Sequence, residues 1–246
     1  MLITGARSGL GKFLSENVRC TPFSRQSNFL NIKGRHFEAV VHCAFNTENS
    51  PTYDRLDKYT YDNIILTHKL LTDITFDRFI FISSIDVYPS DLPDKTENIE
   101  LNINDIGNIY GQTKLMSERM VSAHPNHLIL RCGGIIGPDK FPRSILNIKN
   151  NKYTTLSKTS VLSYVHQQTI LDIIKSPPSP AATGIFNVIS KVPMYITELE
   201  ELYGNIDYGN YVYQASNVPT TKLTTHYPHI QLSSSKDVLF SILKNT

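Results

Sequence analysis

The sequence predicts an α/β fold, in which a doubly wound parallel sheet is covered by helices on both faces. Short apolar runs rich in β-branched and aromatic residues alternate with longer runs whose apolar residues recur at helical spacing. This alternation is regular over the first half of the 246 residues and loosens past Gly137. We therefore expect a sheet domain over residues 1–136. Residues 137–246 are expected to form mainly a smaller lobe, with segments around 161–190 returning to the sheet.

The individual elements follow from this pattern in chain order. The expected strands are residues 1–4, 18–23, 37–45, 78–88 and 127–134. The expected helices are residues 10–18, 55–74 and 109–124. Only eleven residues separate Arg25 from Phe37, whereas a crossover between parallel strands usually needs a dozen or more. We expect the connection after the second strand to lack a full helix.

Composition indicates a compact globular protein. Hydrophobic residues make up 40% and charged residues 19%, and the formal net charge is +2, so no strong field favours nucleic acid or a membrane as partner. We find neither a charged leader nor a run long enough to cross a bilayer, and we expect a cytoplasmic location. Cys20, Cys43 and Cys132 lack metal-ligand spacing, so we expect reduced thiols and no metal site.

Tyr110 and Lys114 form the most informative pair in the chain. They stand four residues apart in an expected helix, and so lie on the same face of it. An ammonium beside a phenol favours the phenolate and lowers the pKa of the tyrosine. The preceding expected strand carries Ser83 and Ser84, whose hydroxyl groups can donate to a carbonyl oxygen. The pattern indicates proton transfer at a carbonyl group.

A glycine-rich turn follows the first expected strand. Gly5 suits a tight turn, and Gly11 permits close packing of the helix on the strand. Ser8 occupies the position of a middle glycine, and Gly9 supplies that glycine one step later. A helix that begins here presents its N-terminus to a pyrophosphate. The turn is therefore expected to bind a dinucleotide.

In this order, these segments resemble the extended, sugar-nucleotide-modifying branch of the short-chain dehydrogenase/reductase superfamily. The segments that carry the resemblance read T-G-A-R-S-G-L-G, V-V-H-C-A, S-S-I-D-V-Y and R-C-G-G-I-I-G-P. The resemblance extends over almost the whole chain. It implies a Rossmann-type doubly wound parallel sheet over residues 1–136, which binds NAD(P), and a small C-terminal substrate-binding lobe.

The resemblance also implies a role for each site residue. Tyr110 is the general acid or base, Lys114 lowers its pKa and binds the ribose, and Ser84 polarises the carbonyl group. Cys43, Ala44 and Phe45 are expected on the adenosine side, and Arg131, Cys132 and Gly133 beside the nicotinamide. The remaining expected cofactor contacts are Gly5, Arg7, Ser8, Gly9, Leu10, Gly11, Ser24, Arg25, Asn63 and Ser83.

The residues after the second strand bear on the choice of cofactor. An NAD-selective fold places Asp or Glu there to bind the ribose 2′-hydroxyl, whereas this chain has Ser24 and Arg25. A guanidinium suits a 2′-phosphate, and Arg7 adds a second cation. NADP(H) is therefore the preferred cofactor and NAD(H) a possible one. Two solvated surface arginines are the alternative interpretation.

The substrate is expected to be a nucleotide-linked sugar, contacted by Ser84, Asp86, Phe141 and Arg143. The segment G-P-D-K-F-P-R-S-I-L resembles one of nucleotide-sugar 4,6-dehydratases, but Ile85 stands where they carry the acid for eliminating water. We therefore favour reduction of a keto group, as in surface-polysaccharide and deoxysugar pathways. An epimerase, a reductase of a non-sugar carbonyl and a non-catalytic dinucleotide-binding sensor stay open as alternatives. Relatives pair through the helices at 54–74 and 110–123, so a homodimer is expected.

Overall fold

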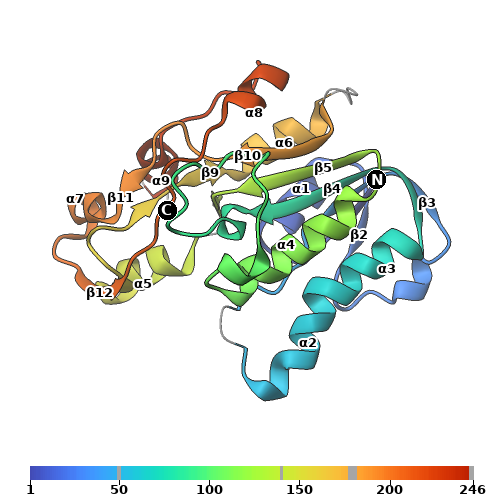
Figure 1. Cartoon of the computed structure of the whole chain (residues 1–246), viewed down its shortest axis with the longest axis horizontal. Coiled ribbons are helices and arrows are strands. Elements are labelled where there is room, and N and C mark those ends of the chain that lie inside the picture. The colour runs from blue at the N-terminus through green and yellow to red at the C-terminus, as the bar shows by residue number, and fades with distance from the viewer. Residues whose placement is uncertain (49–50, 139–140, 177–181, 244–246) are drawn as a thin grey trace. The chain divides into compact units, whose positions relative to one another are not determined.

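The computed structural model describes residues 1–48, 51–138, 141–176 and 182–243 (Figure 1). The chain forms two compact units, each built from segments that are separated in the sequence. Unit 1 comprises Met1–Pro89, Glu97–Arg131 and Pro177–Phe186. Unit 2 comprises Ser90–Thr96, Cys132–Ser176 and Asn187–Thr246.

A six-stranded sheet forms the centre of the α/β fold. In spatial order its strands are β10 (Gly184–Val188), β5 (His127–Cys132), β4 (Thr75–Ser84), β3 (His36–His42), β1 (Leu2–Thr4) and β2 (Thr21–Phe23). β1 pairs in parallel with β2 on one side and with β3 on the other, and β3 pairs in parallel with β4. The chain winds outward in both directions from β1, which confirms the expected Rossmann-type, doubly wound sheet.

The three expected helices of the first half are present. They are α1 (Gly9–Asn17), a second run made of α2 (Leu56–Thr60) and α3 (Leu66–Thr72), and α4 (Ile109–Ser122). A π-helical segment, η3 (Tyr61–Ile65), joins α2 to α3. α3 and α4 lie side by side on one face of the sheet (Figure 1). Right-handed crossovers on the two sides of β1 place α1 on the opposite face.

The connection between β2 and β3 lacks a full helix, as its small number of residues predicts. It carries one 3-10 turn, η1 (Phe29–Asn31), and no α-helix. Consequently β2 is the outermost strand of the sheet on this side. Pro22 lies in β2 and is exposed. A proline is tolerated there because an edge strand need not donate every N–H group to a neighbour.

Apolar side chains from both faces of the sheet form the core of unit 1. In β4 every residue from Arg78 to Ser84 is buried, as expected of a parallel strand covered on both sides. The core cluster draws on β1, β2, β3, β4, α3, α4 and β5 and includes Leu2, Phe23, Val40, Leu70, Phe79, Phe81, Val121 and Ile129. Burying each such side chain stabilises the fold by about 1.5–3 kcal/mol.

Unit 2 contains three two-stranded sheets. They pair β6 (Gly134–Ile136) with β9 (Tyr164–His166), β7 (Tyr153–Leu156) with β12 (Asp207–Tyr211), and β8 (Val161–Leu162) with β11 (Met194–Tyr195). The helices of this unit are α5 (Arg143–Asn151), α6 (Gln167–Lys175), α7 (Glu200–Tyr203), α8 (Thr221–His226) and α9 (Ser235–Leu243). Of the described residues between 161 and 190, those of β10 join the six-stranded sheet, whereas β8 and β9 pair within unit 2.

Short helical turns occupy several connections. They are η2 (Tyr53–Arg55), η4 (Ile85–Val87), η5 (Ile103–Asp105) and η7 (Ile196–Leu199). Cys20, Cys43 and Cys132 are not joined in disulfides. Within the described ranges, no helix has both the length and the apolar character needed to span a membrane. In the same part of the chain, no group of His, Cys, Asp and Glu side chains is arranged to hold a metal ion.

A buried hydroxyl group holds the ends of β1 and β3 together. The Oγ1 atom of Thr4 accepts the backbone N–H groups of Cys43 and Ala44, at 3.1 and 3.0 Å. The same atom lies 2.7 Å from Nδ1 of His42. Because its two accepted bonds leave its own proton to donate, Thr4 donates to Nδ1, and the proton of the neutral imidazole resides on Nε2.

The series of hydrogen bonds continues from the Nε2 atom of His42 into the neighbouring helix. It donates to Oγ1 of Thr67 at 3.0 Å, and Thr67 in turn donates to the carbonyl oxygen of Asn63. His42 is fully buried. Burial, together with the positive charge of Lys114, lowers the pKa of His42 from 6.5 to about 3. His42 is thus a core histidine whose two ring nitrogens are both hydrogen-bonded.

This neutral histidine makes stability depend on pH. The unfolded chain binds a proton at His42 below its ordinary pKa of 6.5, whereas the folded protein resists protonation until about pH 3. The stabilisation that comes from the neutral His42 is therefore present above pH 6.5, and it is lost as the pH falls from 6.5 toward 3. We expect the contribution of His42 to the free energy of unfolding to fall by about 2 kcal/mol between pH 7 and pH 5.

Urea titrations of the wild type and of His42→Gln at both pH values measure this contribution. The variant is expected to be less stable at pH 7, but to lose less stability on acidification. Parallel losses in the two proteins would show that His42 is not held neutral in the folded state.

Candidate active site

The glycine-rich turn leaves β1 next to the end of β3. Gly5 has φ +72°, and a Cβ atom there would lie 3.0 Å from the backbone nitrogen of Ala44. A Cβ atom on Gly11 would lie 2.4 Å from the carbonyl oxygen of Gly5. Ser8 precedes α1 in extended conformation and makes no side-chain capping bond, so the first N–H groups of α1 remain available. This backbone cradle fits the pyrophosphate of a dinucleotide.

The side chains of the turn differ in accessibility. Arg7 and Ser8 are exposed, Gly9 is partly exposed, and Leu10 and Gly11 are buried. The two exposed residues are the ones whose side chains a ligand can reach. Gly9, Leu10 and Gly11 offer a ligand only their backbone.

Two expected cofactor ligands follow β2. Ser24 closes a turn, because its N–H group donates to Oγ of Ser27 at 3.0 Å and its carbonyl oxygen accepts the N–H group of Ser27. Arg25 extends to η3, where its Nη2 atom lies 2.7 Å from Oδ2 of Asp62. The guanidinium that the sequence assigns to a 2′-phosphate therefore has a carboxylate partner within the chain.

Phe45 lies against the residues expected to be catalytic. Its ring centroid is 5.7 Å from that of Tyr110, with the two planes almost perpendicular. The same ring lies 3.6 Å from Nζ of Lys114, a cation–π contact. Cys43 and Ala44, just before it, are partly exposed at the end of β3. The aromatic ring thus covers the ammonium group on which the expected ribose contact depends.

Asn63 connects the loop after β3 to α4. Its side chain accepts the N–H group of Asn46 at 2.7 Å and donates to the carbonyl oxygen of the same residue at 3.1 Å. It also donates to Oγ1 of Thr113, and its own carbonyl oxygen accepts from Ser117 at 2.8 Å. Asn63 is fully buried. The side chain of Asn63, which the sequence assigns to the cofactor, fixes the loop after β3 against α4.

Gly111 sets the position of Tyr110. The side chain of Asn108 caps α4 by accepting the N–H group of Gly111 at 2.7 Å. A Cβ atom on Gly111 would lie 2.0 Å from the carbonyl oxygen of Asp86, so the helix touches the backbone of the turn η4. Ser84 caps that turn through its Oγ atom, which accepts the N–H group of Asp86 at 3.2 Å. One contact therefore brings the helix of Tyr110 to the turn of Ser84.

Lys114 is buried in an aromatic surrounding. Its Nζ atom donates to the carbonyl oxygen of Ile82 at 2.6 Å. It lies 4.7 Å from the ring centroid of Phe81 and 5.7 Å from that of Tyr110. These contacts fix the ammonium group beside the phenol, as the spacing of the two residues predicts.

A buried ion pair lies at the far end of α4. Both carboxylate oxygens of Glu118 accept from Arg131, at 2.8 to 3.2 Å, and Glu118 also accepts from Oγ of Ser83. Arg131 donates to the hydroxyl group of Tyr88 at 2.9 Å. Burial alone would lower the pKa of Arg131, but the charge of Glu118 outweighs it and the pKa is raised. The guanidinium of Arg131 and the hydroxyl group of Ser83 are thus engaged inside the core.

The other expected site residues belong to unit 2. Cys132 is buried, and a Cβ atom on Gly133 would lie 2.7 Å from the carbonyl oxygen of Ser163. Phe141 packs against the apolar core of unit 2. Arg143 begins α5, and its side chain lies outside the described part of the structure.

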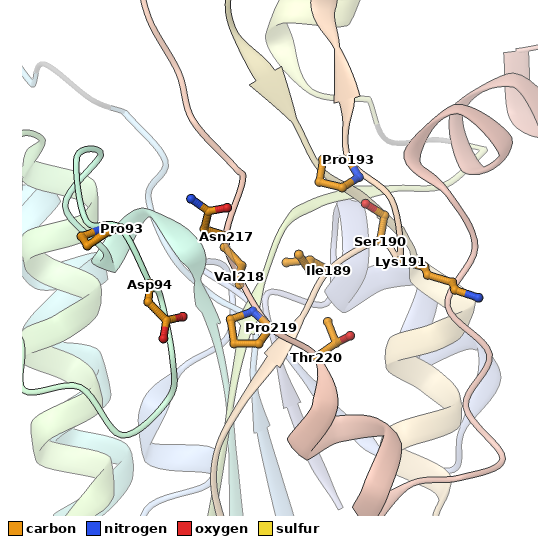
Figure 2. Close-up of a pocket in the computed structure, with 10 residues that line it drawn as sticks. All are labelled: Pro93, Asp94, Ile189, Ser190, Lys191, Pro193, Asn217, Val218, Pro219 and Thr220. Carbon is orange, nitrogen blue, oxygen red and sulfur yellow. The ribbon is translucent and has the colours of Figure 1, made fainter.

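Unit 2 also contains an open pocket of about 480 Å³. Lys95 is buried nearby and donates to the carbonyl oxygens of Gln214 and Ser216, while Asn187 donates to those of Lys95 and Pro219. These bonds hold together the segments that form the pocket. Figure 2 shows its lining, which consists of Pro93, Asp94, Ile189, Ser190, Lys191, Pro193, Asn217, Val218, Pro219 and Thr220. None of these residues was expected at the site from the sequence.

Several other residues that shape the candidate site were not identified from the sequence. Asp62 precedes Asn63 on the expected helix, but nothing local connects it to Arg25. Glu118 was the easier to find, because it stands four residues after Lys114 and so shares a helix face with it. Gly111 directly follows Tyr110, yet its role depends on a backbone oxygen 25 residues earlier in the sequence.

We expect Gly111→Ala to reduce activity sharply while the glycine turn continues to bind its ligand. The added methyl group cannot share space with the carbonyl oxygen of Asp86, so α4 and Tyr110 must move away from Ser84. Displacement by 1 Å can reduce turnover about 100-fold. Gly107→Ala is the matched control, because a Cβ atom there meets nothing within 4 Å. Equal kcat in the two variants would contradict the assignment.

Known proteins resemble this chain in sequence and in fold. Residues 1–167 match the NAD dependent epimerase/dehydratase family. dTDP-D-glucose 4,6-dehydratase from Dictyostelium discoideum is 26% identical over 144 residues, which cover 50% of this chain and 33% of that protein. The match therefore spans about a third of the length of that relative.

Among solved structures, dTDP-4-dehydrorhamnose reductase from Bacillus anthracis in complex with NADP has a TM-score of 0.77 at 16% identity, covering 100% of this chain and 98% of that one. UDP-glucuronic acid 4-epimerase from Bacillus cereus in complex with NAD also has a TM-score of 0.77, at 18% identity, with coverage of 99% and 98%. At these identities the likeness establishes the fold. The family match covers well over half of the sequence, including the glycine turn and the Tyr110–Lys114 helix, and the chain therefore belongs to the NAD dependent epimerase/dehydratase family.

Proposed function

We propose that this protein is an NADP(H)-dependent oxidoreductase that reduces a keto group of a nucleotide-linked sugar, with Tyr110 as the acid. The contact of Gly111 with the backbone of Asp86 carries this proposal. It packs the helix of Tyr110 against the turn that Ser84 caps, and Lys114 stands one helical turn further on. A proton donor, a hydroxyl group and a fixed positive charge then serve one carbonyl group.

The reduction divides between the cofactor and the chain. A nicotinamide bound at the glycine turn would supply the hydride for the carbonyl carbon. The hydroxyl group of Ser84 donates a hydrogen bond to the carbonyl oxygen, and Tyr110 transfers its phenolic proton to that oxygen as negative charge develops. The ammonium group of Lys114 stabilises the phenolate that remains. Its contacts with Ile82 and Phe45 hold the ammonium group in place.

Reduction is favoured over dehydration because of one residue. Elimination of water needs a proton donor next to the catalytic hydroxyl group, and Ile85 provides a buried apolar side chain there. The D. discoideum relative is a dehydratase by name, but it matches only half of this chain. Asp86, on the same turn, stays a candidate for binding the sugar.

Exposed cations near the glycine turn support NADP(H) as the preferred cofactor. Arg7 lies in the turn, and Arg25 follows β2 beside the hydroxyl group of Ser24. The reductase from B. anthracis was solved with NADP, and the epimerase from B. cereus with NAD. NAD(H) remains the alternative cofactor.

The pocket of unit 2 has a lining suited to sugar hydroxyl groups. Asp94 offers a carboxylate, Asn217 an amide and Thr220 a hydroxyl group, set among proline and aliphatic side chains (Figure 2). Its volume of about 480 Å³ falls in the range of small-molecule sites. We therefore propose this pocket of unit 2 as a candidate sugar-binding site. Asp86, Phe141 and Arg143 stay candidates from the sequence.

The direct test is incubation with 4-keto-6-deoxy nucleotide sugars and NADPH, followed by the absorbance of the reduced cofactor. We expect stoichiometric oxidation of NADPH. Tyr110→Phe should lower kcat at least 100-fold and leave the Kd of NADPH near normal, since only the transferable proton is lost. Lys114→Met should impair both turnover and binding.

Other outcomes identify the competing activities. Conversion of a sugar without net oxidation of NADPH would show an epimerase. Activity confined to ketones without a nucleotide would favour a general carbonyl reductase, and binding without any turnover would favour a sensor. Full activity of Tyr110→Phe would refute the catalytic assignment.

We also propose a homodimer that forms through the helices around η3 and α4. Tyr61 and Ile65 on η3 are 45% and 41% exposed, and Met116 on α4 is 42% exposed. Large apolar side chains on two adjacent helices suit a twofold interface. We expect light scattering at micromolar concentration to give the mass of a dimer, and Ile65→Lys with Met116→Lys to shift it toward the monomer.

Leu30→Lys is the control for this experiment. Leu30 is 71% exposed but lies on η1, away from both helices in the sequence. A monomeric wild type, or equal dissociation of all the variants, would contradict the proposed interface.

A further inference from the structure

Arg25 and Asp62 form an unequal ion pair. The distance from Nη2 to Oδ2 is 2.7 Å, and the two side chains are 62% and 10% exposed. The carboxylate is fixed within η3, whereas the guanidinium reaches it from the surface on a long flexible stem. A single Nη2 contact leaves the other guanidinium donors for a further ligand.

The pair spans the end of β1. Arg25 follows β2, and η3 lies in the connection after β3, while β1 lies between β2 and β3 in the sheet. Asn63, the next residue of η3, binds Asn46 four residues past the end of β3. These contacts place η3 at the carboxyl edge of the sheet. The ion pair therefore bridges the two elements that flank the glycine turn.

We propose that Asp62 is a specificity-determining residue that opposes binding of a 2′-phosphate at Arg25. This inference rests on the proposed dinucleotide function. A 2′-phosphate needs the guanidinium that Asp62 already neutralises, and its own negative charge is repelled by that carboxylate. A ribose 2′-hydroxyl group instead can donate to a carboxylate. Asp62 thus narrows the preference for NADPH over NADH that Arg25 creates.

Calorimetric titration of the whole chain with NADPH and NADH measures this preference as the ratio of the two Kd values. We expect Asp62→Asn to raise the preference for NADPH about tenfold, equivalent to ~1.4 kcal/mol, chiefly by tightening NADPH. Arg25→Ala should remove the preference. In the Arg25→Ala background, Asp62→Asn should have a smaller effect, because only the direct repulsion between the carboxylate and the phosphate is then relieved.

Asp73→Asn is the matched control. Asp73 pairs with Lys33, whose side chain is 56% exposed, so the variant removes the same charge from the same unit. Its Kd ratio should equal that of the wild type. Adenosine 2′,5′-bisphosphate and AMP should repeat the shift seen with the whole cofactors. Because Asp62 is mostly buried, circular dichroism should confirm folding, and Asp62→Ser provides a second variant.

The possible outcomes distinguish a failure of this inference from a failure of the proposed function on which it rests. Binding of both cofactors by the wild type, with an unchanged ratio in both Asp62 variants, would overturn the role of Asp62 and leave the proposed function standing. A shift of the same size in Asp73→Asn would also overturn it, since the effect would then be one of net charge. Failure of the wild type to bind either cofactor would overturn both.

Discussion

The hydroxyl group of Thr4 fixes the point from which the site is built. It accepts the N–H groups of Cys43 and Ala44 and donates to His42, so the ends of β1 and β3 share one hydrogen-bonding centre. Gly5, the next residue, rests against the backbone of Ala44. The start of the glycine turn and the course of the loop after β3 are therefore set together. A buried polar group is stabilising only when it is fully bonded, and this one is.

From this centre, hydrogen bonds extend through the π-helical segment to α4. His42 bonds Thr67, and Asn63 connects the loop after β3 to Thr113 and Ser117. π-helical turns often occur at functional sites. Here the carbonyl oxygen of Asn63 accepts from the hydroxyl groups of Thr67 and Ser117. The helix of Tyr110 and Lys114 is thus tied to the turn that is proposed to hold the cofactor.

The sequence predicts those features of the fold and the site that depend on the spacing of nearby residues. Alternating strands and helices, the short connection after β2, and the shared helix face of Tyr110 and Lys114 all follow from local spacing. Contacts between side chains distant in the sequence do not. Arg25 and Asp62 are 37 positions apart, and either residue alone resembles an ordinary surface charge. Phe45 was expected on the adenosine side, and only the fold shows its ring beside Tyr110 and Lys114.

The short connection between β2 and β3 explains why Arg25 depends on a distant partner. With η1 as its only helical turn, the connection leaves β2 at the sheet edge and the side chain of Arg25 largely in solvent. A free arginine retains about 2 kcal/mol of rotamer entropy, and binding a ligand in one orientation must overcome it. Asp62 reduces that loss by holding the guanidinium, but it also competes for the same charge. The carboxylate of Asp62 therefore both orients the guanidinium and competes with the ligand for its charge. For a doubly charged phosphate the competition dominates, because the repulsion between the carboxylate and the ligand grows with the ligand's charge. The choice of cofactor is then a property of the pair.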